Sequence, residues 1–183
     1  MQINGKFIYL KRINIKDANF IYNLRRKKNI GLYLHKPQIS INFQKRWILK
    51  NLQNKKVLDF VIYRKKKNKK LGTIAFDKIT RLNAEWGRWI SQGNIVENIE
   101  AVIVLLDYGF NIIGLKNIYS LTNKDNNKVV NFHKNTTAKY EGIIKSLFRI
   151  NNKKVDAVKF NFNKKRFNNF KRKFSSMIEL IQK

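Results

Sequence analysis

The side chains of this chain that could transfer protons or act as nucleophiles are few. The sequence holds 2 histidines, 11 aspartates and glutamates, and no cysteine. Without cysteine, a thiolate nucleophile, thiolate metal ligands and a disulfide framework are all excluded. The remaining groups suit proton transfer by a carboxylate or an imidazole, which requires neither a metal nor a covalent intermediate. We therefore expect no metal site.

Positive charge dominates the composition. The 40 lysines and arginines against 11 acidic residues give a formal net charge of +29. Such a field attracts polyanions, which include nucleic acid, anionic membranes and small molecules that carry phosphate. Asparagine, isoleucine and lysine are all abundant, as in chains encoded by AT-rich genomes, so part of the excess reflects codon usage.

The length of 183 residues fits one ordinary domain. Apolar residues make up 43% of the chain and are spread along nearly all of it, so we expect a folded core. Residues 1–6 lack the features of a signal peptide, and no stretch approaches the roughly 18 apolar residues of a membrane span. A cytoplasmic protein is the expectation.

The spacing of apolar residues predicts a mixed order of strands and helices. Alternation at period two predicts a first strand over residues 6–15, and a one-sided apolar pattern predicts a helix over 17–28. Ser40 can cap a second helix over residues 41–52. Further strands are predicted over residues 57–63, 71–76, 83–90, 117–121, 141–150 and 155–162.

The clearest helix begins at Ile95 and runs to Phe110, with apolar residues at helical spacing and Gly114 as a stop signal. A short helix is predicted over residues 126–134, and a basic terminal helix after residue 163. Together these elements predict a mixed α/β sheet. We expect one domain over residues 1–163 and a basic helical extension over residues 164–183.

Three segments resemble the GNAT family of N-acetyltransferases, and the order of elements over residues 5–162 matches that fold. Residues 84–90 resemble its fourth strand, and residues 100–118 its main helix with the turn that follows. Residues 126–134, followed by Glu141 and Gly142, resemble its last helix and the start of the next strand. The resemblance implies an α/β (α+β) fold, a mostly antiparallel central sheet, and acetyl-CoA as co-substrate.

Within this family the chain resembles the branch of ribosomal-protein N-acetyltransferases and of the acetyltransferases in nonulosonate sugar pathways, such as pseudaminic acid biosynthesis. Residues 24–26 and 85–87 resemble motifs of the sugar enzymes. This implies acetylation of an amine on a nucleotide-linked amino sugar in bacterial surface-glycan biosynthesis. The implied substrate-binding residues are Arg25, Arg26 and Arg88 for the diphosphate, Trp47 and Trp86 for the sugar or base, and His35 for the sugar.

The resemblance also implies which residues act on the acetyl group. Glu85 is the implied base, and His133 stands where many relatives carry a tyrosine that protonates the departing thiolate. Each has a structural alternative: an ion pair for Glu85 and a packing position for His133. The implied cofactor-binding residues are Trp89, Ile90, Ser91, Asn94, Asn98 and Asn126.

One segment departs from the family pattern. The glycine-rich loop that binds the coenzyme A pyrophosphate through backbone amides should fall at residues 93–98, where its second and third small residues are missing. Glu97 places a negative charge there. It either stabilises the first helical turn or weakens the cofactor site, and in the second case the chain could be a non-catalytic member of the family.

Three other functions remain open from the sequence. A nucleic-acid-binding module would use the same positive field, but the basic residues are scattered and no known nucleic-acid motif is present, so we do not expect this partner. Acetylation of protein N-termini would keep the fold and change the substrate. The basic segment 164–183 could contact an anionic membrane surface or form a homodimer.

Overall fold

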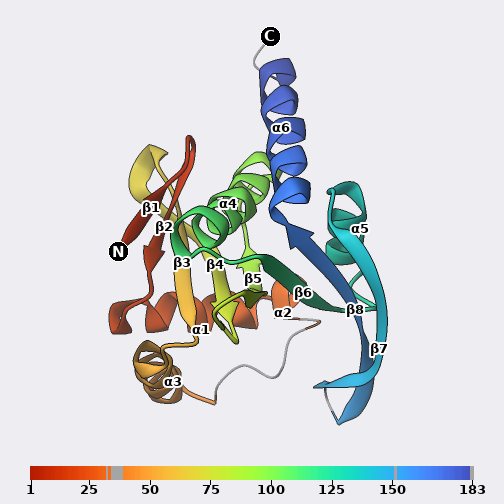
Figure 1. The fold of residues 1–183 in the computed structure, drawn as a ribbon. Helices are drawn as coiled ribbons and strands as arrows, with labels where there is room; N and C mark the ends of the chain where they lie inside the picture. The colour runs from red at the N-terminus through yellow and green to blue at the C-terminus, as the bar shows by residue number, and fades with distance from the viewer. Residues whose placement is uncertain (32, 34–38, 151, 182–183) are drawn as a thin grey trace.

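The computed structural model describes residues 1–31, 33, 39–150 and 152–181. Its strands form an eight-stranded sheet in the order β1-β2-β3-β4-β5-β6-β8-β7 (Figure 1). β5 and β6 pair in parallel, and the other described pairs are antiparallel. The strands are β1 (Gln2–Asn4), β2 (Ile8–Arg12), β3 (Leu58–Arg64), β4 (Lys69–Asp77), β5 (Asn83–Ser91), β6 (Asn117–Asn123), β7 (Lys139–Ile150) and β8 (Lys153–Asn163).

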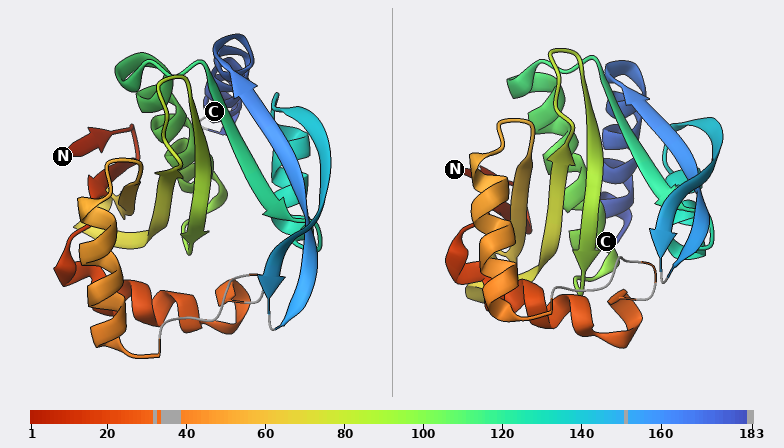
Figure 2. Two further views of the ribbon diagram at one scale, coloured as in Figure 1. Left: turned by 60° about the horizontal axis from the view of Figure 1, so that its bottom comes forward. Right: turned by 90° about the horizontal axis from the view of Figure 1, so that it is seen from below.

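Helices cover both faces of the sheet, with α3 on the near side and α4 and α6 behind it in the right-hand view of Figure 2. We call these faces the α3 face and the α4 face. None of the helices in the described ranges combines the length and apolar character that a membrane crossing requires. The helices are α1 (Ala18–Arg26), α2 (Lys28–Gly31), α3 (Ile41–Gln53), α4 (Ile95–Tyr108), α5 (Asn127–Asn135) and α6 (Lys164–Ile181).

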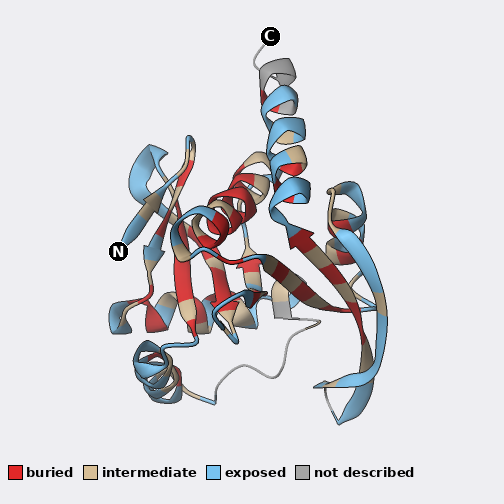
Figure 3. Ribbon diagram, in the orientation of Figure 1, coloured by how far each residue is buried: buried red, intermediate tan, exposed pale blue. Residues whose placement is uncertain are grey.

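The main core lies between the sheet and α4, where Figure 3 shows the inner strand surfaces and the helix as buried. Side chains along residues 101–106 of α4 are all buried, so the helix is apolar on every side that meets protein. The helix passes into a π-helical turn, Gly109–Ile113, and Gly114 follows in the left-handed region with φ of 82°. Glycine adopts this conformation without a Cβ clash, which explains the stop signal in the sequence.

The terminal helix α6 packs into this same core. Phe167 and Phe170 are buried, and their rings lie 5.3 Å from Phe110 and 5.8 Å from Phe162. Ile178, one residue of the apolar end of the sequence, is buried as well. The helix predicted after residue 163 is therefore present, and its apolar face meets the core rather than solvent.

The predicted fold class, a mostly antiparallel mixed sheet with flanking helices, is confirmed. The first predicted strand was too long: β2 ends at Arg12 and a 3-10 turn follows at Ile15–Asp17. Asn14 caps this turn, since its backbone N–H donates to Asp17 Oδ2 at 2.9 Å and its side chain accepts from Lys16 N at 2.8 Å. The short strand β1 was not predicted.

Candidate functional site

The parallel strands β5 and β6 separate part of the way along their length. They pair at three positions that end with Glu85 opposite Tyr119, and beyond this point they diverge (Figure 2). Beyond this point the backbone N–H and C=O groups on the facing edges of β5 and β6 do not pair with each other. This opening is the centre of the candidate site, because most of the residues singled out in the sequence lie around it.

β5 carries a bulge beside this opening. Its register against β4 shifts between Thr73 and Ala75, and Arg88 has a positive φ of 48°. Thr73 Oγ1 donates to the Arg88 carbonyl oxygen at 3.1 Å, which fixes the bulged backbone from the neighbouring strand. A non-glycine residue in this conformation costs free energy that the surrounding contacts must offset.

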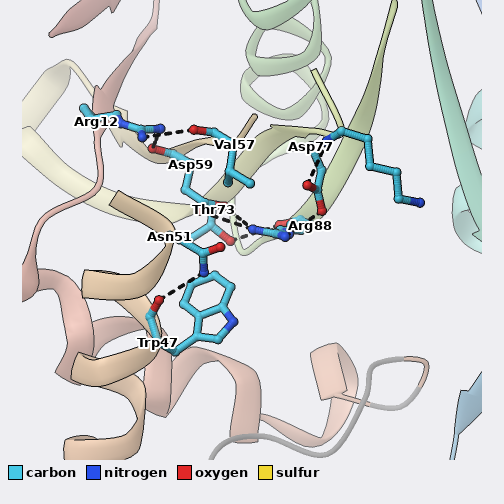
Figure 4. A network of polar contacts seen from close by, with 9 residues as sticks. Arg12, Trp47, Asn51, Val57, Asp59, Thr73, Asp77 and Arg88 are labelled. Carbon is cyan, nitrogen blue, oxygen red and sulfur yellow. Dashed lines mark hydrogen bonds and ion pairs between the residues drawn. The ribbon is translucent and has the colours of Figure 1, made fainter. Parts of the chain in front are cut away.

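The side chain of Arg88 supplies such contacts on the α3 face (Figure 4). Its Nη1 lies 3.1 Å from Asp59 Oδ1 on β3, and its Nη2 lies 2.6 Å from Asp77 Oδ2 on β4. Burial raises the pKa of Asp59, and the charge of Arg88 opposes that rise. The guanidinium also lies 5.3 Å from the centre of the Trp47 ring on α3. Arg88 is thus engaged by two carboxylates.

Of the other arginines proposed from the sequence, Arg25 is half-buried on α1. Burial lowers the pKa of Arg25, and the charge of Arg88 lowers it further. Arg26 is exposed, with its guanidinium 3.8 Å from the centre of the Tyr22 ring. His35, predicted to contact the sugar, lies outside the described residues.

Glu85 shares the α3 face with these groups. Its Oε2 lies 2.7 Å from Lys78 Nζ, and its side chain is 18% exposed. Burial raises the pKa of Tyr119, the residue opposite Glu85 on β6, and Glu85 raises it further. The ion pair foreseen as the structural alternative for Glu85 is therefore present, at the point where the two strands separate.

His133 lies on the other side of the opening, in the core. Its ring stacks on Phe160 with centroids 4.7 Å apart, and its Nε2 lies 3.1 Å from Ser120 Oγ. Burial lowers the pKa of His133 to about 3, so the imidazole is neutral near pH 7. A neutral, buried imidazole is a poor proton donor, which favours the packing alternative. Successive β residues alternate in direction, so Glu85 points away from Trp86, on which His133 packs at 5.3 Å.

An aromatic cluster fills the α4 side of the opening. Trp86 and Trp89 lie 5.8 Å apart, and Trp89 lies 4.9 Å from Phe132 of α5. Three buried polar atoms of this region have no hydrogen-bond partner among the described residues: Trp86 Nε1, Trp89 Nε1 and His133 Nδ1. Buried polar groups without partners are rare, and a ligand is one explanation for them. Two indole donors and an imidazole nitrogen fit the amide groups of a pantetheine arm.

The first turn of α4 closes on itself. Glu97 Oε2 accepts the Asn94 backbone N–H at 2.8 Å, and Asn94 Oδ1 accepts that of Glu97 at 2.9 Å. Asn98 Nδ2 donates to the Gly93 carbonyl at 2.8 Å. Glu97 is also ion-paired with Arg64, whose hydrogen bond lowers the pKa of that carboxyl group. The backbone N–H groups of Asn94 and Glu97 are therefore bonded to side chains. In the GNAT loop that the sequence resembles, such groups bind the pyrophosphate.

The remaining residues proposed to bind the cofactor lie at the ends of these elements. Ile90 pairs with Thr73 and is buried, and Ser91 Oγ accepts the Gly93 N–H at 3.0 Å. Asn126 caps α5, with its Oδ1 3.3 Å from the Val129 backbone nitrogen. Trp89, Ile90 and Ser91 flank the opening on β5, and Asn126 flanks it from the β6 side.

The sequence interpretation missed four polar residues of the α3 face: Thr73, Asp59, Asp77 and Tyr119. Two of them carried a detectable signal, because a carboxylate inside an apolar β run is unusual unless it is paired. Asp59 interrupts such a run on β3, and Asp77 ends one on β4. Thr73 and Tyr119 carry no comparable signal, since both residue types are common in strands.

The chain matches one family model, described as "Acetyltransferase (GNAT) domain", over residues 8–137. No curated protein matches it. A GCN5-related N-acetyltransferase from Brucella melitensis is similar in structure, with a TM-score of 0.84 and 15% identity, covering 96% of this chain and 84% of that one. At these identities the likeness shows a shared fold.

Two other similar structures are of enzymes with different substrates. A spermidine N-acetyltransferase from Vibrio cholerae in complex with CoA and spermine has a TM-score of 0.78 and 23% identity, covering 90% of this chain and 100% of that one. FdhC, described as a nucleotide-linked sugar GNAT, has a TM-score of 0.78 and 21% identity, covering 96% and 97%.

Proposed function

Because this chain belongs to the GNAT family and is an acetyl-CoA-dependent N-acetyltransferase, we propose that its acceptor is the amine of a nucleotide-linked amino sugar. The product would serve bacterial surface-glycan biosynthesis in the cytoplasm. The likeness to a nucleotide-linked sugar GNAT supports this choice, and the likeness to a spermidine acetyltransferase supplies the main competitor.

The observation that carries the proposal is the charge arrangement on the α3 face. Each of the carboxylates Asp59, Asp77 and Glu85 already has a basic partner within 3.1 Å. The positive charge of Arg88 acts on Arg25, in a chain of net charge +29. A polyamine needs uncompensated carboxylates and is repelled by this field, whereas a diphosphate is attracted to it.

For the acceptor, Arg25 and Arg26 would hold the diphosphate, with Trp47 beside the sugar or base. Trp86, also expected there from the sequence, is buried on the α4 side against His133 and would contact the donor instead. The Arg88 guanidinium is committed to two carboxylates, so its part would be to shape the site and add to its positive potential. Glu85 would accept a proton from the amine, directly or through a water molecule, while Lys78 holds its carboxylate in place.

For the donor, acetyl-CoA supplies an activated acetyl thioester when it is bound. The backbone of Trp89, Ile90 and Ser91 would pair with the pantetheine arm, and the orphaned indole N–H groups of Trp86 and Trp89 would donate to its carbonyls. Asn126 would contact the arm from α5, while Asn94 and Asn98 would lie at its phosphate end. The burial of His133 favours a role in packing this wall over proton donation.

A homodimer and a peripheral membrane contact remain proposals for the α6 segment. Its phenylalanines Phe167 and Phe170 are buried in the core, so a contact through the described part of α6 would use its basic side chains. Such a contact would weaken as salt is raised.

Kinetics with two acceptors test the proposal. Arg25→Ala should raise the KM for a uridine-diphosphate-linked amino sugar by about tenfold, since one charge-assisted contact to phosphate is lost. The KM for the same amino sugar without its nucleotide should not change. Arg81→Ala, an exposed arginine in the β4–β5 connection, is the matched control. Equal effects of both variants on both acceptors would refute the role of Arg25.

A further inference from the structure

A basic cleft lies next to the closed first turn of α4, on the side away from β6. Its volume is about 510 Å³, and it is bounded by the turn between β1 and β2, the tip of the β3–β4 hairpin, α4 and α6. Both basic and apolar side chains line it. The lining residues are Lys6, Arg64, Lys65, Lys66, Phe7, Val96, Ile178, Asn94 and Glu97.

The backbone that carries Lys6 is fixed by a buried carboxylate. Glu100 of α4 accepts the backbone N–H groups of Lys6, Phe7 and Ile8, the last two at 2.9 Å. The turn comes so close to the helix that a Cβ on Gly5 would lie 2.8 Å from Glu100 Cδ. The position of Lys6 at the mouth of the cleft is therefore built into the fold.

The hairpin tip is tied to the same turn and helix. The backbone N–H of Lys65 donates to the Phe7 carbonyl at 2.9 Å. Arg64 Nη2 lies 2.9 Å from Glu97 Oε2. Lys65 and Lys66 follow directly and are exposed, and Lys69 adds positive potential at Glu97. The lining thus holds three lysines, Lys6, Lys65 and Lys66, beside the Arg64–Glu97 ion pair.

We propose that this cleft binds the phosphate groups at the nucleotide end of acetyl-CoA, through its lysine side chains instead of the backbone amides of α4. The proposal rests on the donor stated above. The backbone N–H groups of Asn94 and Glu97 already bond to side chains of the first turn. The Glu97 carboxylate also lies at this turn, so cationic donors beside it would strengthen the binding of phosphate. Ammonium and guanidinium groups bind phosphate oxygens strongly.

The apolar part of the lining favours a nucleotide over a bare anion. Phe7, Val96 and Ile178 offer a surface on which an adenine base or a ribose can pack while the phosphates meet the basic rim. The same cleft is confined between two turns and two helices. A nucleic acid would instead need an extended basic track for its backbone.

Calorimetric titration with adenosine 3′,5′-bisphosphate, the phosphorylated nucleotide end of coenzyme A without its arm, tests the proposal. We expect saturable binding that acetyl-CoA displaces. The double variant Lys65→Ala/Lys66→Ala should bind both ligands about tenfold more weakly, or weaker still. Lys153→Ala/Lys154→Ala, at the tip of the β7–β8 hairpin, removes the same charge from another exposed hairpin and should leave both affinities within about twofold. Thermal unfolding confirms that each variant is folded.

Either of two results would overturn the proposal: bisphosphate binding that acetyl-CoA does not displace, or equal losses in both double variants. S-acetyl-pantetheine is a donor without phosphate, so it does not need the cleft. Transfer from it tests the proposed function separately from the cleft. Its KM as a donor should be the same in Lys65→Ala/Lys66→Ala as in the original protein. If neither donor supports transfer to any amino sugar, the proposed acceptor is wrong while the nucleotide titration still decides the cleft.

Discussion

The guanidinium of Arg88 on β5 reaches over β4 to the carboxylate of Asp59 on β3, with Nη1 3.1 Å from Oδ1. Asp59 is buried, burial raises the pKa of its carboxyl group, and the charge of Arg88 opposes that rise. Arg88 is also the residue of positive φ at the bulge. The ion pair therefore links the charge of the α3 face to the backbone shape of β5 where it leaves β6.

Replacing Arg88 by methionine should destabilise the protein by about 2 kcal/mol, because Asp59 is left buried without its cation. The loss should stay below the roughly 3–5 kcal/mol of fully buried pairs, since the Arg88 side chain is 32% exposed. Urea denaturation measures the change. In the double variant with Asp59→Asn part of the loss should be recovered, and strict additivity of the two substitutions would show that the pair is not coupled.

His133 should make stability depend on pH in a defined window. Its pKa is about 3 in the folded chain and near the ordinary 6.5 when unfolded, so only the unfolded state takes up this proton between those values. Stability is then complete above about pH 6.5 and falls toward pH 3, by up to about 1.4 kcal/mol per pH unit. His133→Phe should remove this contribution, and denaturation series at several pH values would show a shallower slope.

Carboxylates such as Glu97 and Asp156, whose pKa values are lowered in the fold, also stabilise the protein less as pH falls. For this reason the prediction for His133 concerns the difference between the two proteins. Identical slopes between pH 6.5 and pH 4 would contradict the burial of a neutral imidazole. If His133→Phe also keeps near-normal turnover, proton donation by this residue is ruled out.

Glu85→Gln should lower kcat by about 10² to 10⁴-fold if this carboxylate is the base, with little change in the KM for the acceptor. Glutamine preserves size and a hydrogen bond to Lys78 but cannot accept the proton. Glu141→Gln is the matched control, since Glu141 is ion-paired with Lys159 at 3.1 Å on β8. If the folded Glu85→Gln protein has normal turnover, Glu85 is not the base and its role is the ion pair with Lys78.

The packing of α6 predicts that this helix is needed for folding. Phe167→Ala should cost about 3–5 kcal/mol, as expected for truncating a buried phenylalanine, because its ring is buried against Phe110. Lys165→Ala on the exposed side of the same helix should change stability by less than about 0.5 kcal/mol. Thermal and urea unfolding compare the two. A small effect of Phe167→Ala would mean that residues 164–183 form an independent extension.

Local patterns in the sequence were sufficient to predict most elements of the fold. The period of the apolar residues predicted α4, and Gly114 marked its end because the chain needs a positive φ there. The strands predicted over residues 57–63 and 71–76 correspond to β3 and β4, which pair as a hairpin. These signals lie within one element and its flanking turns, so no knowledge of the tertiary fold was needed.

The arrangement of the site depends on contacts between distant segments, which such patterns do not encode. Arg88 meets Asp59 and Asp77 only because three strands lie side by side. Glu97 meets Arg64 because the hairpin returns to the start of α4. The sequence left two roles open for Glu97 and for His133, and the burial of both side chains favours the structural one.

The most direct test of the account is acetyl transfer from acetyl-CoA, followed by release of the free thiol and by mass spectrometry of the acceptor. The panel would hold nucleotide-linked 4-amino sugars, spermidine, and a peptide with a free N-terminus. We expect turnover with an amino sugar nucleotide and a gain of one acetyl group on its amine. Turnover with spermidine or the peptide but with no sugar nucleotide would contradict it.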